Sequence, residues 1–276
     1  MPPVPPAQPD HHGDATPTAS APPSKRSLET DASASSAPFT IPKPFDTALS
    51  NNFTADCANF WRRMLTNEAF DQCHPFSMML QTSNSFFNAQ KTYIRITQTL
   101  EATCNVNMTQ CLGTMNGLAR ELVSDGACRA DYENDNPQVL QAYNGLIAYE
   151  PLYQASCLRD DQGSYCFANA VTNTSATTDS YPYYLPLGSP MPGGARPTCN
   201  SCLQDAMAIF SSFAGNSTQP ISKTYDGAAG QIAISCGPNF VNRTATPLKG
   251  AAGPGPSASL TPTLTLITML LVYWLQ

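Results

Sequence analysis

The chain is poor in charged residues and in histidine. Only 12% of its 276 residues are Asp, Glu, Lys or Arg, and only three are histidine, whereas ordinary soluble domains carry about 25% charged residues. The formal net charge is -6. Nucleic-acid binding needs clustered Lys and Arg to neutralise phosphates, so we expect no nucleic-acid partner. So few histidines also argue against a histidine-rich metalloenzyme, and we expect neither a metal nor a cofactor.

Strand-like alternation of apolar and polar residues is missing, whereas helical spacing is frequent. Apolar residues recur every three or four positions in the segments 76–87, 93–104, 111–122, 139–150, 203–214 and 225–236, which is typical of amphipathic helices. A further helix is predicted over 54–65 with Thr54 as its N-cap. We therefore predict an all-α, disulfide-reinforced domain of about seven helices, with a short irregular segment at 181–187.

Composition divides the chain into four parts. Residues 1–38 are rich in Pro, Ser and Ala, and we predict a disordered tail because they cannot bury enough apolar surface to offset their ordering entropy. Residues 39–243 contain all ten cysteines and form the predicted cysteine-rich domain. Residues 244–263 are a predicted linker and attachment region, and residues 264–276 a hydrophobic C-terminal signal.

The ten cysteines are even in number, which permits five disulfides. They are Cys57, Cys73, Cys104, Cys111, Cys128, Cys157, Cys166, Cys199, Cys202 and Cys236. Only Cys199 and Cys202 have the C-x-x-C spacing that also occurs in zinc sites and redox enzymes. Zinc would need a second close pair of ligands, and a redox motif normally follows a strand, so structural disulfides are favoured. The order of cysteines and helices in the first half of the domain is weakly repeated in the second half. This repeat favours a Cys202–Cys236 pair.

Five Asn-x-Ser/Thr triplets are candidate N-glycosylation sites. They begin at Asn52, Asn107, Asn173, Asn216 and Asn242. Each lies near a predicted helix boundary or loop, where an attached glycan stays exposed. Together with the cysteines they indicate a secreted glycoprotein.

The C-terminus has the order of features that a GPI-attachment signal requires: small residues, a spacer of ~8–12 residues and an apolar tail of ~10–20. Gly250 is the preferred attachment site and Ala251 the next, followed by a spacer over 253–263 and a tail over 264–275. A membrane span is the alternative, but the tail is shorter than the ~20 residues that a span needs. We expect the protein at the outer leaflet of the plasma membrane or in the cell wall, with the membrane and wall glycans as partners. A secretory leader is expected upstream of this chain or already removed, because residues 1–40 have no apolar leader pattern.

A set of short motifs resembles a known family. They lie at residues 39–46, 73–77, 157–158, 165–167, 183–188, 199–202 and 236–241. The arrangement looks like an uncharacterised family of fungal secreted proteins, a domain of unknown function that often carries GPI tails. The resemblance covers about 39–241. It implies a disulfide-bonded helical domain at the cell surface or wall and supplies no catalytic residues.

Signs of catalysis are few, and we expect a structural or ligand-binding protein. His74 is the only histidine within the domain and is more simply structural than a base. The alternative is a carbohydrate-active enzyme that uses paired carboxylates. Its candidate residues are Asp131, Glu133 and Asp135, or Asp160 and Asp161. The aromatic run 181–184 is interpreted as a loop packed on the core rather than a platform for stacking sugars.

Overall fold

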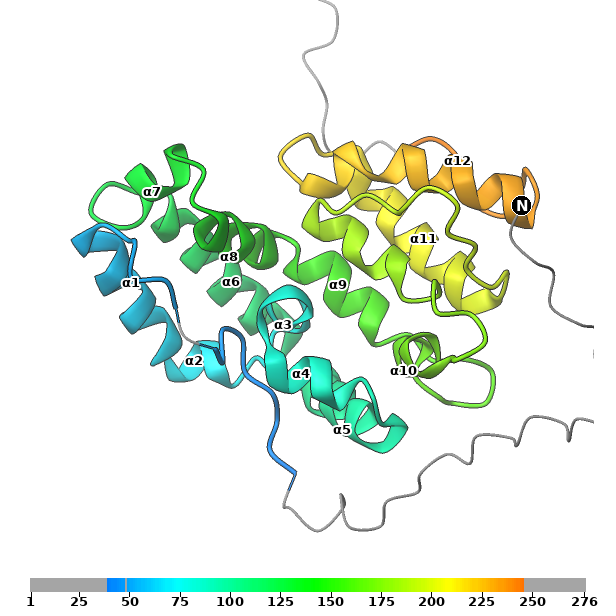
Figure 1. The fold of residues 1–276 in the computed structure, drawn as a ribbon, viewed down its shortest axis with the longest axis horizontal. Coiled ribbons are helices and arrows are strands. Elements are labelled where there is room, and N and C mark those ends of the chain that lie inside the picture. The colour runs from blue at the N-terminus through cyan, green and yellow to red at the C-terminus, as the bar shows by residue number, and fades with distance from the viewer. Residues whose placement is uncertain (1–38, 48, 246–276) are drawn as a thin grey trace, which may run out of the picture. The chain divides into compact units, whose positions relative to one another are not determined.

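The computed structural model describes residues 39–47 and 49–245 (Figure 1). Within these residues the chain forms twelve α-helices, two 3-10 helices and no strand. The elements are α1 (Ala55–Leu65), α2 (Glu68–Asp71), α3 (Phe76–Thr82), α4 (Asn84–Ala89), α5 (Tyr93–Cys104), α6 (Met108–Leu122), α7 (Arg129–Glu133), α8 (Pro137–Ile147), α9 (Tyr149–Ser156), α10 (Cys166–Thr172), η2 (Tyr181–Leu187), α11 (Ser201–Ala214), η3 (Pro220–Lys223) and α12 (Tyr225–Cys236). The all-α prediction is confirmed.

Each of the seven predicted segments contains a helix, and two of them contain a break. Ser83 ends α3, and its hydroxyl accepts a hydrogen bond from the Phe86 amide at the start of α4. Ala148 separates α8 from α9. As predicted, Thr54 caps α1. Pro137 lies in the first turn of α8, where a helix tolerates proline. The short helices α2, α7, α9 and α10 were not predicted, because four to eight residues are too few to establish a period.

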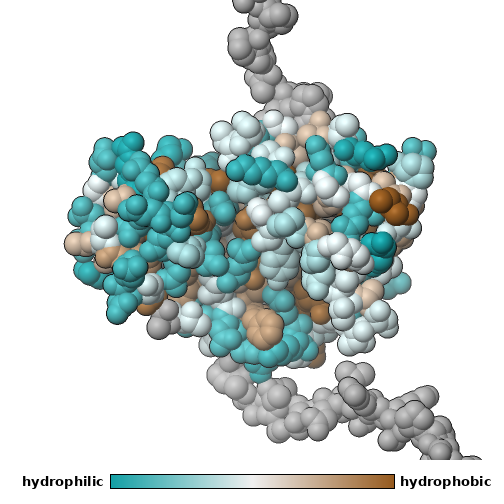
Figure 2. Space-filling model, turned by 45° about the horizontal axis from the view of Figure 1, so that its top comes forward, coloured by the Kyte–Doolittle hydropathy of each residue, from teal (hydrophilic) through white to brown (hydrophobic). Residues whose placement is uncertain are grey.

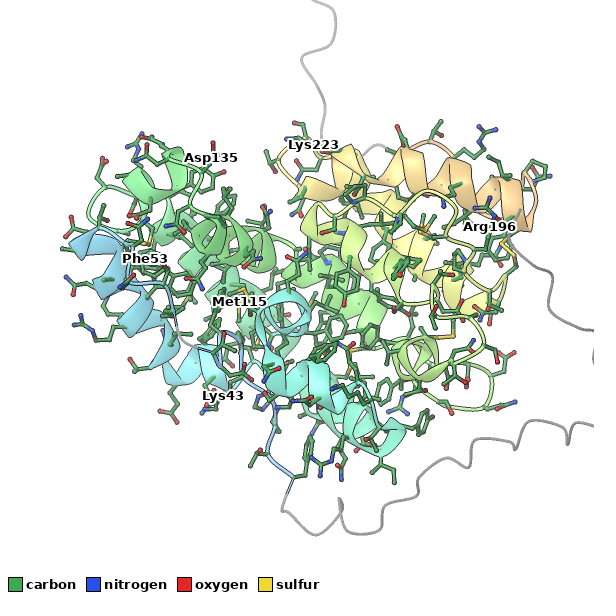
Figure 3. All side chains as sticks on the ribbon, in the orientation of Figure 1. Lys43, Phe53, Met115, Asp135, Arg196 and Lys223 are labelled. Carbon is green, nitrogen blue, oxygen red and sulfur yellow. A yellow bond between two sulfur atoms is a disulfide. The ribbon has the colours of Figure 1, made fainter. Side chains whose placement is uncertain are left out.

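The buried side chains form two clusters, and helices α3 and α9 contribute to both. Met78 belongs to the cluster of α1, α6 and α8, whereas Met79 belongs to the cluster of α10, α11 and α12. Tyr149 and Leu152 divide α9 in the same way. Neighbouring positions of a helix point in different directions, so one helix can serve two cores. In Figure 3 Met115 lies among the helices of the first cluster, where it is fully buried.

The segment just before α1 is anchored to the helical domain. Phe45 is buried, and its ring meets Trp61 edge-on at a centroid distance of 4.6 Å. The neighbouring carboxylate of Asp46 accepts hydrogen bonds from the Asn84 amide at 2.7 Å and the Ser83 hydroxyl at 2.9 Å. Burial raises the pKa of Asp46, but these bonds and two from Ser85 outweigh it, so the pKa lies below its ordinary value. The carboxylate therefore stabilises the start of α4.

All ten cysteines are paired, as the even count predicted. The disulfides are Cys57–Cys128, Cys73–Cys111, Cys104–Cys157, Cys166–Cys202 and Cys199–Cys236. The predicted Cys202–Cys236 pair is wrong. Cys202 faces α10 from the first turn of α11, whereas Cys199 precedes that helix and meets the end of α12. The two sulfurs of the C-x-x-C motif are thus engaged in different directions, and neither is available as a zinc ligand or a dithiol.

The weak repeat between the two halves of the domain is also present in the order in which their cysteines form disulfides. Cys73, Cys104, Cys111 and Cys157 are joined first to third and second to fourth. The set Cys166, Cys199, Cys202 and Cys236 is joined in the same crossed order. Cys199 is the second cysteine of its set, as Cys104 is of the first set. Since Cys104 pairs with the fourth cysteine, the repeat predicts the observed Cys199–Cys236 pair and not Cys202–Cys236.

On the face that Figure 2 shows, hydrophilic and intermediate residues predominate and hydrophobic residues are scattered. The large hydrophobic side chains exposed in the described residues are Phe87, Tyr93, Ile94 and Ile234. No helix in the described ranges has the length and apolar character needed to cross a membrane. The predicted tail 1–38, the linker from 246 onward and the C-terminal signal 264–276 lie outside the described residues.

Candidate functional site

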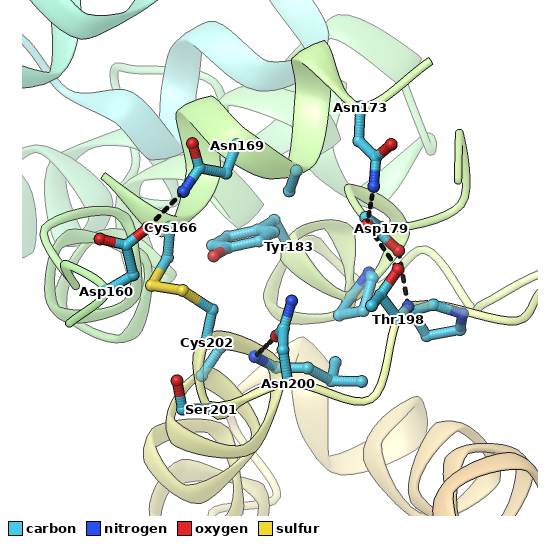
Figure 4. Close-up of a pocket in the computed structure, with 15 residues that line it drawn as sticks. Asp160, Cys166, Asn169, Asn173, Asp179, Tyr183, Thr198, Asn200, Ser201 and Cys202 are labelled. Carbon is cyan, nitrogen blue, oxygen red and sulfur yellow. Dashed lines mark hydrogen bonds between the residues drawn. A yellow bond between two sulfur atoms is a disulfide. The ribbon is translucent and has the colours of Figure 1, made fainter. Parts of the chain in front are cut away.

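The candidate site is a polar cavity of about 220 Å³ beside α10, η2 and the start of α11 (Figure 4). Its polar lining consists of Asp160, Asn169, Asn173, Asp179, Tyr183, Thr198, Asn200 and Ser201. The Cys166–Cys202 disulfide forms part of its wall and joins α10 to α11. Elements distant in sequence are therefore held together covalently around the cavity.

One side of the cavity is organised by Asp160. Its Oδ1 accepts hydrogen bonds from the Gln162 and Ser164 amides, both at 2.9 Å. Its Oδ2 accepts one from Asn169 Nδ2 at 2.7 Å. These three bonds close the turn between α9 and α10 and orient the Asn169 carboxamide at the cavity wall, as Figure 4 shows.

The opposite side is organised by Asp179. Its Oδ1 accepts from the Thr198 amide at 2.6 Å, and its Oδ2 accepts from the Thr198 hydroxyl at 3.0 Å. Asn173 Nδ2 donates to the same Oδ2 at 2.8 Å. Asp179 thereby fixes the segment that leads into α11, where Asn200 Oδ1 accepts from the Leu203 amide as the N-cap. An Asn that precedes an apolar helical segment is a recognisable capping signal, but no sequence signal singles out Asp179.

Tyr183 lies between these two sides. Its ring is packed against Phe167 at a centroid distance of 4.8 Å and against Phe210 at 6.4 Å, and only 3% of the residue is exposed. The predicted core-packed role of the run 181–184 therefore holds for Tyr183, whose faces are not available for stacking sugars. Burial, reinforced by the negative charge of Asp179, raises the pKa of Tyr183 far above its ordinary value. Its hydroxyl stays protonated and can both donate and accept hydrogen bonds.

The other predicted carboxylate candidates lie away from the cavity. Asp131 is buried and accepts hydrogen bonds from the backbone amide and the hydroxyl of Thr54, the N-cap of α1. Glu133 accepts from Arg129 Nε at 3.0 Å. Asp135 and Asp161 are exposed. Among all the predicted carboxylate candidates, only Asp160 lines the cavity. The second carboxylate of the lining is Asp179 and not Asp161.

His74 lies in a different place, at an open hollow beside Cys73 and Asn107. Its backbone has a φ of 40°, and its carbonyl oxygen accepts from the Thr103 hydroxyl at 3.1 Å. Burial lowers the pKa of His74, opposed by Asp71 and reinforced by Lys43. Within the described part of the chain, no group of three His, Cys, Asp or Glu side chains could hold a metal ion.

The five predicted glycosylation residues differ in exposure and in the hydrogen bonds that their side chains make. Asn52, Asn107 and Asn242 are exposed, and Asn173 and Asn216 are partly exposed. Asn107 uses its Oδ1 to cap α6, which leaves Nδ2, the atom that carries a glycan, out of that bond. Asn173 is the exception, because its Nδ2 donates to Asp179. The predicted attachment residues Gly250 and Ala251 lie outside the described residues.

Comparison with protein families gives one match. A family profile described as "Domain of unknown function (DUF7729)" matches residues 40–245. This range includes the candidate cavity and all five disulfides. No curated protein and no solved structure matches the chain.

Proposed function

The chain belongs to the DUF7729 family, whose domain has no known function, and from that premise we propose an extracellular role. The protein is a glycoprotein held by a GPI anchor at the outer leaflet of the plasma membrane or in the cell wall. There it acts as a structural or ligand-binding protein rather than as an enzyme. The resemblance of its motifs to fungal secreted proteins supports a fungal cell surface.

The observation that carries this proposal is the complete pairing of the cysteines. No cysteine of the described residues is free, and the five disulfides span 36 to 71 positions of sequence. Disulfides persist in oxidising compartments and are rare in the cytosol. The domain also has two buried clusters of side chains, which include several of the bonded cysteines, so the disulfides reinforce a hydrophobic core. Such reinforcement suits a protein that stays folded outside the cell.

The exposed Asn-x-Ser/Thr triplets support the same compartment. Three of the five acceptor asparagines are exposed and the other two are partly exposed, and attachment of a glycan requires exposure. The order of small residues, spacer and apolar tail in residues 250–275 supports the anchor.

A non-enzymatic role is supported by the bonding of the candidate carboxylates. Asp131 and Asp160 each accept hydrogen bonds that fix a turn or a helix start. A general acid or nucleophile has to present its carboxyl group to the substrate. The hydrogen bonds instead commit these groups to holding the backbone.

The anchor is tested by expressing the full chain behind a secretory leader in a eukaryotic cell. A phospholipase that cuts the phosphoinositol linkage should release the protein from the surface, and the released form should end near Gly250. Changing Gly250, Ala251 and Ala252 together to Trp, Leu and Phe should block release and retain the protein inside the cell.

The matched control changes Gly250, Ala251 and Ala252 to Ser, Gly and Ser. These residues are as small as the original ones, and the spacer and tail are unchanged, so release should persist. A surface protein that resists the phospholipase and still contains residues 264–276 would show a short membrane tail in place of the anchor.

A further inference from the structure

The Tyr183 hydroxyl has no hydrogen-bond partner among the described residues, although Tyr183 is only 3% exposed. Figure 4 shows its ring lying across the cavity, with no hydrogen bond at the hydroxyl. The hydroxyl is not among the side-chain atoms of the described residues that are both fully enclosed and without a partner, so it opens onto the cavity that Tyr183 lines. The hydroxyl of Tyr183 is therefore available to water or a ligand in the cavity.

A second group is directed into the same space. Asn200 uses Oδ1 to cap α11, and its Nδ2 points into the cavity toward Tyr183 in Figure 4. The cavity thus presents a carboxamide donor and a hydroxyl that both donates and accepts. The Asn169 carboxamide, held through its Nδ2 by Asp160, lies at the same wall.

The charge of the cavity restricts the ligand. Asp160 and Asp179 lie on opposite sides, and none of the ion pairs in the described part of the chain involves either residue. Two uncompensated carboxylates repel an anion, so phosphates and acidic sugars are disfavoured. Each carboxylate already accepts three hydrogen bonds from the protein. A calcium ion, which needs six to eight oxygen ligands, would have to break several of them.

The size of the cavity restricts the ligand further. Its volume of about 220 Å³ is below the roughly 300–1,000 Å³ of pockets that hold drug-sized ligands. It accommodates one small polar ring and not an extended apolar molecule. The Cys166–Cys202 disulfide and the packed Tyr183 ring fix its walls, which lowers the ordering cost of binding.

We propose that this cavity binds one neutral sugar unit at the end of an oligosaccharide, through the Tyr183 hydroxyl and the Asn200 carboxamide. The ligand contributes several hydroxyl groups, each both donor and acceptor, which match the uncharged donors and remaining acceptors of the wall. The sugar is recognised through hydrogen bonds to the hydroxyl at the edge of the buried Tyr183 ring, and not by stacking on the face of that ring. The inference rests on the proposed cell-surface function only for the source of the glycan.

The test titrates the full, disulfide-bonded chain with neutral oligosaccharides in solution. The probes are two- to six-unit oligomers of β-1,3-linked glucose, α-1,6-linked mannose and β-1,4-linked N-acetylglucosamine, followed by isothermal titration and by NMR. At least one series should bind at or below about 10 mM, and oligomers of glucuronic acid should not. Because binding is measured in solution, its outcome is independent of whether the anchor exists.

Two variants locate the site. Tyr183→Phe removes only the hydroxyl and should weaken binding about tenfold or more. Asn200→Asp keeps an oxygen to cap α11 but replaces the donor with an acceptor, and it should weaken binding similarly. Tyr184→Phe is the matched control, because the same change one residue away alters a hydroxyl that bonds to Gln90 outside the cavity. Thermal midpoints close to that of the unmodified protein would establish that all three variants fold.

Three results would overturn the inference. They are failure of every neutral series to bind, equal binding by all three variants, and binding of calcium or tetramethylammonium in the cavity that is lost in Tyr183→Phe. The last result would assign the cavity to a cation. Loss of binding in Tyr183→Phe and Asn200→Asp with retention in Tyr184→Phe supports the sugar site.

Discussion

The sulfur of Met78 occupies the place that a Cβ on Gly145 would take. A methyl group built on Gly145 would lie 2.6 Å from Met78 Sδ and 3.3 Å from Met78 Cα. Next to this contact, the Ser77 hydroxyl donates to the Gly145 carbonyl oxygen at 2.6 Å. Helices α3 and α8 therefore approach closely only because residue 145 has no side chain, and α3 is one of the two helices shared by both cores.

Gly145→Ala should lower stability. The added methyl overpacks the α3–α8 contact, where overpacking costs about 1–3 kcal/mol. Because the methyl would approach the Met78 backbone as well as its sulfur, we expect this cost to outweigh the roughly 1 kcal/mol gained from the higher helix propensity of Ala. Thermal unfolding should show a midpoint lower by a few degrees. Gly113→Ala is the control, because Gly113 is exposed within α6 with nothing within 4 Å of its built Cβ. That control should be neutral or stabilising, and an equal drop in both variants would contradict the packing argument.

Removal of residues 1–36 should leave stability unchanged, whereas removal of residues 1–46 should reduce it. The longer deletion loses the Phe45–Trp61 contact and the hydrogen bonds of Asp46 to the start of α4. Burial of one Phe side chain alone contributes about 1.5–3 kcal/mol. Urea unfolding of chains beginning at Ala37 and at Thr47 measures the difference. A large loss already in the chain beginning at Ala37 would show that the preceding residues dock on the domain.

The disulfide pattern predicts which thiols appear when one cysteine is changed. Alkylation of the denatured, unreduced protein should label no cysteine. Cys202→Ser should expose Cys166 to alkylation, and not Cys236, because Cys202 pairs with Cys166. Removing both Cys199 and Cys236, which are 37 positions apart, should lower stability by about 4 kcal/mol through the larger entropy of the unfolded chain. Labelling of Cys236 in Cys202→Ser would instead support the Cys202–Cys236 pair.

Mature protein should carry no glycan at Asn173. The atom that would carry the glycan donates to Asp179 at 2.8 Å at the wall of the cavity, so a sugar on that nitrogen would crowd the residues that surround this hydrogen bond. Glycopeptide mapping should find glycans among Asn52, Asn107, Asn216 and Asn242. Asn173→Gln should lower the thermal midpoint, while Asn52→Gln, at an exposed position, should not. A glycan at Asn173 on properly folded protein would contradict this arrangement.

Stability should depend on pH through His74. The pKa of His74 lies below its ordinary value of 6.5 in the folded state, chiefly because burial disfavours the charged ring. The unfolded chain therefore binds the proton more readily, so this contribution is complete above about pH 6.5. It is lost as the pH falls from there through the folded-state pKa.

The urea midpoint measured between pH 5 and 7.5 should fall more at low pH in the unmodified protein than in His74→Asn. Asn tolerates the positive φ of this position, so the variant removes the titration without straining the backbone. Identical pH profiles for the two proteins would contradict the assignment to His74. The difference between them also cancels the contribution of Glu150, whose pKa burial raises.

The sequence by itself determined the helical class, the helix start at Thr54 and the use of cysteines in disulfides. These follow from local rules, since a helix repeats every 3.6 residues and a cap depends on its nearest amides. The same rules predict the breaks between helices poorly. At the break between α3 and α4, Ser83 donates a hydrogen bond to the carboxylate of Asp46, which lies 37 positions earlier in the chain. A period of three or four residues continues across such a break without a visible change.

Only the tertiary structure decided which residues meet. Asp160 and Asp179 lie at one cavity because α10, η2 and the start of α11 converge there, and no spacing in the sequence encodes that convergence. The partner of Cys236 was likewise decided by packing, because Cys199 and Cys202 lie within one C-x-x-C motif and face different neighbours. Contacts between distant segments depend on which helices pack against each other. The periodicity of a single sequence identifies the apolar face of each helix, but not the helix that packs against that face.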